Sequence, residues 1–257
     1  MTEADRREYE ISFKEEHIDI PLVLFDSAAS TNDEAKAYAE CHSNDAVFIA
    51  KRQTAGKGRL GRSFSSAEGG LYLSYLTHPD VAPKRATVLT VFAAVSLCRA
   101  IEELVPEASP TIKWVNDLRI GNRKLAGILT EGRIAADGSL GYAVIGIGVN
   151  VRRRDYPEEL SLIATDIESE LGVKLSIPRL AAALVRNLSQ FGSTPAAEYM
   201  EEYRRRSCVI GKRVTVIGAD GSYEAEAIAI TDDGELRVRL DDGSTKDLFT
   251  GEVSIKI

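Results

Sequence analysis

The sequence contains few of the residues that build metal sites and covalent cross-links. Its 257 residues include only three cysteines and three histidines. Cys41, Cys98 and Cys208 are far apart, odd in number and outside any Cys-x-x-Cys pattern. This spacing argues against both a disulfide framework and a zinc site, so we expect reduced thiols that are mostly packed in the fold.

Long apolar runs and excess positive charge are also lacking. No apolar run reaches the ~18 residues that cross a bilayer, and the first twenty residues lack the apolar core of a secretory signal. We therefore expect a cytoplasmic protein without membrane association. The formal net charge of −7 argues against general attraction to nucleic acid. A composition of 44% apolar and 28% charged residues is ordinary for a globular chain with one large core and a smaller module.

One segment departs from this acidic background. Residues 51–62, KRQTAGKGRLGR, contain five Lys or Arg and three Gly without an acidic residue. Glycine lets backbone N–H groups approach a ligand, and the cations attract phosphate or carboxylate. The spacing matches neither the nucleotide-binding P-loop nor Gly-x-Gly-x-x-Gly. The segment is either an anion-binding loop or a solvated surface loop. The choice between the two depends on the residues found elsewhere in the sequence.

The hydrophobic pattern predicts a mixed α and β fold. At one helix start, Thr31 is a candidate N-cap and Glu34 completes a capping box. Short connections predict antiparallel neighbours for the last three strands of the first unit. The expected strands span 22–25, 47–50, 71–76, 111–118, 124–133 and 142–151, and the expected helices span 83–104, 165–171 and 178–203. After residue 207 short alternating strands joined by Asp-Gly turns predict a small β module, which gives domains 1–206 and 207–257.

Two glycines interrupt the strand expected at 142–151. Gly146 and Gly148 share one face, so that face of the sheet would be bare. A ligand or another backbone lying on the sheet would explain them, and a β-bulge is the alternative. Asn150 follows, and it suits either a hydrogen bond to a flat polar ring or a turn.

Lys124 follows a Gly-Asn turn and enters an otherwise apolar strand. Its ammonium group would suit a phosphoryl oxygen, although a lone lysine there is usually a solvated edge residue. Trp114, Asn116 and Asp117 end the neighbouring strand and would add an apolar wall, an amide and a carboxylate. Trp114 taken alone would be a core residue.

Together these segments resemble the biotin protein ligases. Five motifs are similar to that family in order and spacing: STN at 30–32, QxxGKGRxGR at 53–62, KWxND at 113–117, RKLAGIL at 123–129 and GIGVN at 146–150. The resemblance implies an α+β fold, with a mixed, largely antiparallel sheet and packed helices of the class II synthetase-like type found in biotin and lipoate ligases. It also implies that the C-terminal module is an SH3-like β-barrel.

The resemblance implies a two-step activity. Biotin and ATP give biotinyl-5′-AMP and pyrophosphate, and the biotinyl group then passes to a lysine of a biotin carboxyl carrier protein. Mg²⁺ would bridge the leaving phosphates, although no metal-ligand cluster stands out in the sequence. A homodimer is left open. Too few residues precede the first strand for a helix-turn-helix module of roughly 50 residues, so no DNA-binding repressor role is expected.

The resemblance also implies roles for individual residues. The expected biotin-binding residues are Ser30, Thr31, Gln53, Gly56, Lys57, Arg59, Trp114, Lys124 and Gly127. The expected ATP or adenylate-binding residues are Arg59, Arg62, Phe64, Asn116, Lys124, Gly148 and Asn150. Among them, Lys124 would lie beside the biotin carboxylate and the α-phosphate, and Arg59 would order over the adenylate. Asp117 would orient or deprotonate the acceptor lysine, or else would be a turn or ion-pair residue.

Three positions depart from the family pattern. Val115 stands where Pro is usual, Lys57 where Arg is usual and Phe64 where Trp is frequent. The changes affect the turn before Asp117 and the bidentate geometry of the loop. The competing interpretations are a lipoate or octanoate ligase, a biotin-binding protein without turnover, and a nucleic-acid-binding protein that uses the basic loop and the C-terminal module.

Overall fold

The first unit of the fold is a seven-stranded sheet. The computed structural model describes residues 1–154, 156, 158–218, 221–249 and 252–255. The strand order is β1-β2-β3-β7-β6-β5-β4, and all neighbours are antiparallel except the parallel pair β1 and β2. The strands are β1 (Leu22–Phe25), β2 (Ala46–Ala50), β3 (Gly70–Thr77), β4 (Thr111–Lys113), β5 (Asp117–Ile120), β6 (Arg123–Ile134) and β7 (Leu140–Asn150).

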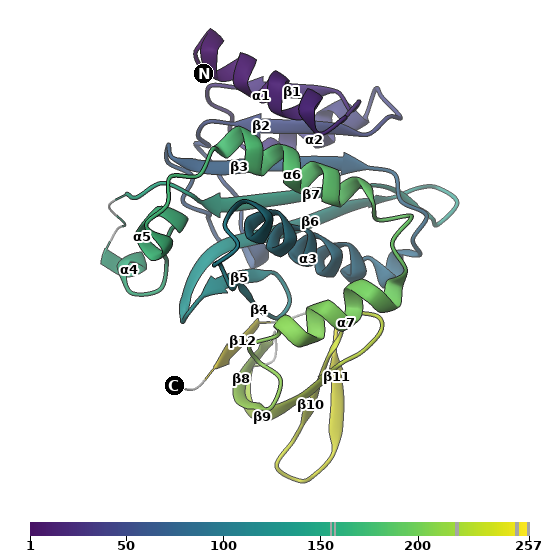
Figure 1. The fold of residues 1–257 in the computed structure, drawn as a ribbon. Helices are drawn as coiled ribbons and strands as arrows, with labels where there is room; N and C mark the ends of the chain where they lie inside the picture. Colours follow the sequence, from purple (N-terminus) through teal and green to yellow (C-terminus); the bar gives the residue numbers. More distant parts are fainter. Residues whose placement is uncertain (155, 157, 219–220, 250–251, 256–257) are drawn as a thin grey trace.

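Helices cover both faces of this sheet. Figure 1 shows α3 (Thr87–Leu104) and α6 (Ile177–Ser189) lying across the same face. Val47 and Ile49 of β2 point into this main core, whereas Phe48 joins Ala35 of α2 (Thr31–Ala39) on the opposite face. Alternate residues of β2 therefore bury in different layers, which explains its continuous apolar run.

The remaining helices border these layers. α1 (Glu3–Glu15) packs against α6 through the buried side chains of Tyr9 and Phe13. The chain also forms the short helices η1 (Arg59–Gly61), η2 (Pro83–Arg85), α4 (Glu158–Ser161) and α5 (Ile167–Leu171), and the longer α7 (Ala196–Arg206). In the described part of the chain, no helix combines the length and apolarity needed to cross a membrane.

A second, five-stranded antiparallel sheet follows α7. Its strand order is β11-β10-β9-β8-β12. Its strands are β8 (Lys212–Gly218), β9 (Gly221–Ile230), β10 (Leu236–Arg239), β11 (Thr245–Leu248) and β12 (Glu252–Ile255). The expected β module is therefore present as a sheet. Its closure into an SH3-like barrel and the boundary between residues 206 and 207 stay predictions.

Three local expectations were wrong. The strand expected at 111–118 is a hairpin, because residues 114–116 leave the ladder and form the turn between β4 and β5. The helix expected at 178–203 is broken into α6, which ends at Ser189, and α7, which begins at Ala196 after the N-cap Pro195. Pro195 is incompatible with one continuous helix, because it lacks the N–H for an intrahelical hydrogen bond. At α2 the N-cap is Ser30 rather than Thr31, and no side chain caps the helix.

Candidate active site

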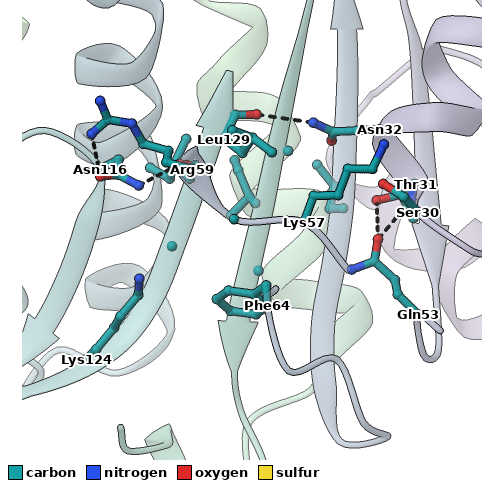
Figure 2. Close-up of a pocket in the computed structure, with 17 residues that line it drawn as sticks. Ser30, Thr31, Asn32, Gln53, Lys57, Arg59, Phe64, Asn116, Lys124 and Leu129 are labelled. Carbon is teal, nitrogen blue, oxygen red and sulfur yellow. Dashed lines mark hydrogen bonds between the residues drawn. The ribbon is translucent and has the colours of Figure 1, made fainter. Parts of the chain in front are cut away.

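A hollow lies over β6 and β7, between α2 and the basic loop (Figure 2). It encloses about 480 Å³ of space, its open mouth included. Its floor is formed by residues 127–129 and 146–148, and the described lining also includes Ser30, Thr31, Asn32, Gln53, Lys57, Gly58, Arg59, Phe64, Leu73, Asn116 and Lys124.

One end of this hollow carries uncharged polar groups that are fixed by one another. The backbone N–H and the hydroxyl of Thr31 both donate to Gln53 Oε1, at 2.8 and 3.1 Å. Gln53 Nε2 donates to Ser66 Oγ at 2.9 Å, and Ser74 Oγ lies 2.7 Å from Thr31 Oγ1. Because its side chain is held by Gln53 and Ser74, Thr31 acts in the wall of the hollow and not as a helix cap. This end can recognise a neutral polar group with groups that are already oriented.

The two glycines of β7 create space that other side chains enter. A Cβ at Gly146 would lie 2.2 Å from Asn32 Oδ1, and a Cβ at Gly148 would lie 2.4 Å from Phe64 Cε1. Both glycines keep regular pairing with β3 and β6, so the alternative of a β-bulge here is wrong. The predicted bare face is therefore covered in part by Asn32 and by the Phe64 ring, which forms an apolar surface on the floor.

The other end of the hollow is charged. Lys124 Nζ lies 2.6 Å from Asp117 Oδ1 and 6.0 Å from the centroid of the Phe64 ring. The backbone of Lys124 is held on both sides, because its N–H donates to the Ile163 carbonyl and its carbonyl accepts from the Thr165 N–H. The lysine is therefore a fixed point charge that remains partly exposed toward the hollow.

Arg59 reaches this charged end from the basic loop. Its Nη1 donates to Asn116 Oδ1 at 3.3 Å, and Asn116 Nδ2 in turn donates to the Ile128 carbonyl at 2.8 Å (Figure 2). A second cation of the loop, Lys57, forms an ion pair with Asp33 of α2 at 2.6 Å. The loop is thus connected to both sides of the hollow.

The environment of the Asp33 carboxyl, which contacts the loop through Lys57, alters its pKa. Burial would raise the pKa of Asp33, but hydrogen bonds and charge from Lys57 and Lys36 outweigh burial and hold the pKa below its usual value. The Lys57–Asp33 contact is therefore ionic at neutral pH.

A second hollow adjoins the first at Lys124. The two share Gly58, Arg59, Phe64, Asn116 and Lys124. The second hollow adds Leu60, Arg62, Ser63, Lys113, Trp114 and Asp117. Four cations and one carboxylate line it, so it is suited to an anion. The charged end of the first hollow therefore continues into a cationic second hollow, and Arg59 and Lys124 line both.

Three predicted site residues lie elsewhere or face another way. Gly56 is packed between the two arms of the loop, since a Cβ there would lie 2.4 Å from Ser66 Oγ. Trp114 is 3% exposed, lines only the second hollow and donates through Nε1 to the Gly234 carbonyl at 2.8 Å. Asn150 is buried at the end of β7 and donates to the Thr165 carbonyl at 2.9 Å. The hollows described above do not include Gly56 or Asn150.

Two residues were not predicted, one in the lining of the first hollow and one beside Asn150. Asn32 lines the first hollow and donates to the Leu129 carbonyl and to Glu131. Its position in the STN motif, directly after two expected site residues, could have indicated that it belongs to the site. Arg154 donates to Asn150 Oδ1 at 2.7 Å. It belongs to a run of three arginines in which no residue stood out by its neighbours in sequence.

Comparisons with known proteins agree with this geometry. Residues 24–150 match the model of the Biotin/lipoate A/B protein ligase family, and residues 209–256 match the Biotin protein ligase C terminal domain. The Bifunctional ligase/repressor BirA of Bacillus subtilis is 30% identical over 245 residues, which are 91% of this chain and 74% of that protein. The Biotin--[acetyl-CoA-carboxylase] ligase of Mycobacterium tuberculosis is 33% identical over 225 residues, 83% of this chain and 80% of that protein.

A solved structure is similar over nearly the whole chain. The biotin protein ligase from Aquifex aeolicus in complex with biotin and ATP has a TM-score of 0.74 and 27% identity. The match covers 92% of this chain and 98% of that one. The similarity therefore includes both sheets.

Proposed function

The chain belongs to the biotin protein ligase family, and from this premise we propose that it activates biotin with ATP and transfers the biotinyl group to a lysine of an acceptor protein. The first family model also includes lipoate ligases, whereas the model matched by residues 209–256 is that of biotin protein ligases. The C-terminal match therefore favours biotin over lipoate or octanoate.

The observation that carries the proposal is the meeting of two unlike hollows at Lys124. Biotin has a neutral ureido ring and an anionic tail, and ATP is a polyanion. The recess with Thr31 and Gln53 suits the ring, and the recess with Arg59, Arg62 and Lys113 suits the nucleotide phosphates. Lys124 then lies where the biotin carboxylate and the α-phosphate have to meet.

In the first step, a carboxylate oxygen of biotin attacks the α-phosphorus of ATP. The bond from that phosphorus to the bridging oxygen breaks, and pyrophosphate leaves. Two anions must approach each other, so charge neutralisation and orientation provide most of the catalysis. Lys124 supplies the central charge. Arg59, which Asn116 orients, supplies a second cation from the loop.

The basic loop also protects the product. Biotinyl-5′-AMP is a mixed anhydride that water would hydrolyse, so exclusion of water is part of the function. Arg59 and Lys57 connect the loop to Asn116 and to Asp33, on opposite sides of the hollow. We propose that these contacts hold the loop over the adenylate.

In the second step, the acceptor lysine attacks the acyl carbon, the bond to the phosphate oxygen breaks, and AMP leaves. The acceptor amine has a reference pKa near ~10.4 and must lose a proton. Asp117 is the carboxylate of the second hollow, and its Oδ1 lies 2.6 Å from Lys124 Nζ. We propose that it orients the incoming amine and accepts that proton.

Mg²⁺ is proposed to enter with the nucleotide. Among the residues that the structure describes, no group of three or more His, Cys, Asp or Glu side chains could hold a metal. That composition fits an ion bound mainly by phosphate oxygens and water, which is a usual mode for Mg²⁺. The ion would neutralise charge on the leaving pyrophosphate.

The acceptor and the assembly are also proposals. We propose that the acceptor is a biotin carboxyl carrier protein domain, since a curated relative is named for acetyl-CoA carboxylase. A cytoplasmic location stays a prediction, and the choice between monomer and homodimer stays open. The net charge of −7 supports the prediction that the chain is not generally attracted to DNA. The absence of operator binding stays a prediction, and a mobility-shift assay tests it.

The experiment that tests the function is pyrophosphate exchange into ATP, with biotin, lipoate or octanoate supplied separately and without an acceptor. We expect exchange with biotin alone. Exchange with lipoate or octanoate instead would reassign the substrate, and absence of exchange with all three acids would leave a binding protein.

A further inference from the structure

Arg154 lies four residues beyond the end of β7 and connects segments that are distant in the sequence. Its guanidinium donates to Asn150 Oδ1 at 2.7 Å, to the Tyr72 hydroxyl at 3.2 Å and to the Ser65 carbonyl at 3.2 Å. One planar group therefore bridges the end of β7, the strand β3 and residues 63–67, which follow the basic loop and are called its returning arm below.

The contacts with the loop form a pair. Arg154 holds the Ser65 carbonyl directly, and Tyr72, whose hydroxyl donates to the Ala67 carbonyl at 2.5 Å, holds a second loop carbonyl. Arg154 also donates to that hydroxyl, so it contributes to both of these contacts. The arm carries Phe64, which covers the floor of the hollow.

The contact with Asn150 fixes the orientation of its amide. Asn150 Nδ2 donates to the Thr165 carbonyl, and its Oδ1 accepts from Arg154. Each end of the amide is therefore engaged by a different segment. A change in the position of Arg154 would therefore change the orientation of the Asn150 side-chain amide at the end of β7.

The Arg154 side chain is half-buried, and part of its guanidinium is enclosed. It stacks over the Tyr156 ring, with Cζ 4.8 Å from the ring centroid, and its Nε is buried without a hydrogen-bond partner in the described structure. The three hydrogen bonds above all end on uncharged oxygens. Burying a charged group in this way is costly, which argues for a role beyond solvation of the surface.

We propose that Arg154 is a positioning residue that couples closure of the basic loop to the nucleotide side of the site through Asn150. The inference rests on the proposed function and on the family resemblance, which implies that Asn150 binds the adenylate although neither hollow includes it. When the loop lies on the sheet, Arg154 holds Ser65 and orients Asn150 together. Loss of Arg154 releases both.

The test uses Arg154→Lys and Arg154→Ala, with Arg153→Ala as the matched control. Arg153 is the exposed neighbour, and its side chain donates to Ser169 Oγ at 3.4 Å, away from the loop. A lysine keeps the charge but cannot hold three acceptors in the fork geometry of a guanidinium. Both Arg154 variants should therefore raise the KM for ATP by about tenfold, as expected for loss of a hydrogen bond from a charged group, and leave the KM for biotin within about twofold.

A second measurement does not depend on catalysis. Trypsin cleaves after Lys57, Arg59 and Arg62, so the rate of cleavage in the loop reports how firmly it is held. We expect faster cleavage in Arg154→Lys and Arg154→Ala than in Arg153→Ala at equal thermal stability. If the parent shows no pyrophosphate exchange but the variants still release the loop, the proposed function fails while the attachment of the loop by Arg154 stands.

A double-mutant cycle tests the coupling itself. If Arg154 acts through Asn150, the effects of Arg154→Lys and Asn150→Ala on the KM for ATP are not additive. Additive effects, or unchanged KM for ATP and unchanged loop cleavage in a folded Arg154→Lys variant, would overturn the proposal.

Discussion

The indole N–H of Trp114 donates to the carbonyl of Gly234 at 2.8 Å, and the two residues lie in turns of different sheets. Gly234 has φ +80°, and a Cβ there would lie 3.0 Å from a Val91 methyl group. The turn between β9 and β10 therefore rests directly on the turn between β4 and β5. The latter turn carries Asn116 and is followed by Asp117, so the C-terminal sheet supports site residues from behind.

Trp114→Phe should reduce stability while it keeps most of the apolar packing. The substitution leaves the buried Gly234 carbonyl without its donor, which costs about 1–3 kcal/mol of unfolding free energy. Urea denaturation followed by circular dichroism measures the change. An unchanged midpoint in Trp114→Phe would show that the contact between the turns contributes little.

Lys124→Ala should abolish adenylate formation in a folded protein. It removes one of the two cations, Arg59 and Lys124, that line both hollows, so we expect a loss of at least about 100-fold in pyrophosphate exchange. Lys124→Arg is the companion variant that retains charge and changes geometry. Normal exchange by a folded Lys124→Ala protein would remove this lysine from the mechanism.

Arg59→Ala should shorten the time for which the adenylate is retained. The loop loses its contact with Asn116, so the intermediate should escape or hydrolyse roughly tenfold faster. Release of labelled biotinyl-5′-AMP after gel filtration measures this rate. Arg52→Ala, a charge change at an exposed position of the same loop, is the control and should retain the adenylate like the parent.

Asp33→Asn should weaken the fold by an amount that depends on pH. The pKa of Asp33 is lowered in the folded state, so its ion pairs stabilise the fold above the unfolded pKa of about 3.9 and are lost as pH falls through the folded pKa. The carboxylate is partly exposed, so the difference at pH 6 should be below about 1 kcal/mol. Chemical denaturation from pH 6 to pH 3 should show the parent and the variant converging, with Asp19→Asn as the exposed control.

Much of the site could be read from the sequence because its cations occur in short motifs. The basic loop and Lys124 line the same hollow. Lys124 also forms an ion pair with Asp117, which was one of the two interpretations of Asp117, and the role of Asp117 toward the acceptor lysine stays a prediction. The expected strands at 22–25, 47–50 and 71–76 correspond to β1, β2 and β3 within one residue at each end.

Other features depended on contacts between distant segments. Thr31 has the sequence of a helix cap, but Gln53 competes for its hydroxyl, and propensity alone does not reveal that competition. The turn at residues 114–116 likewise forms where the second sheet meets the first. α1 was missed although a local signal was present, since Thr2 and Asp5 form a capping box.

The contact between Gly148 and Phe64 has a consequence for variation among related sequences. The ring fills volume that a side chain on β7 would otherwise occupy. Enlarging position 148 alone should force the ring out of its site, whereas a smaller residue at 64 would make room for it. We therefore expect residue sizes at the two positions to vary in opposite directions, so that their summed volume is the conserved quantity.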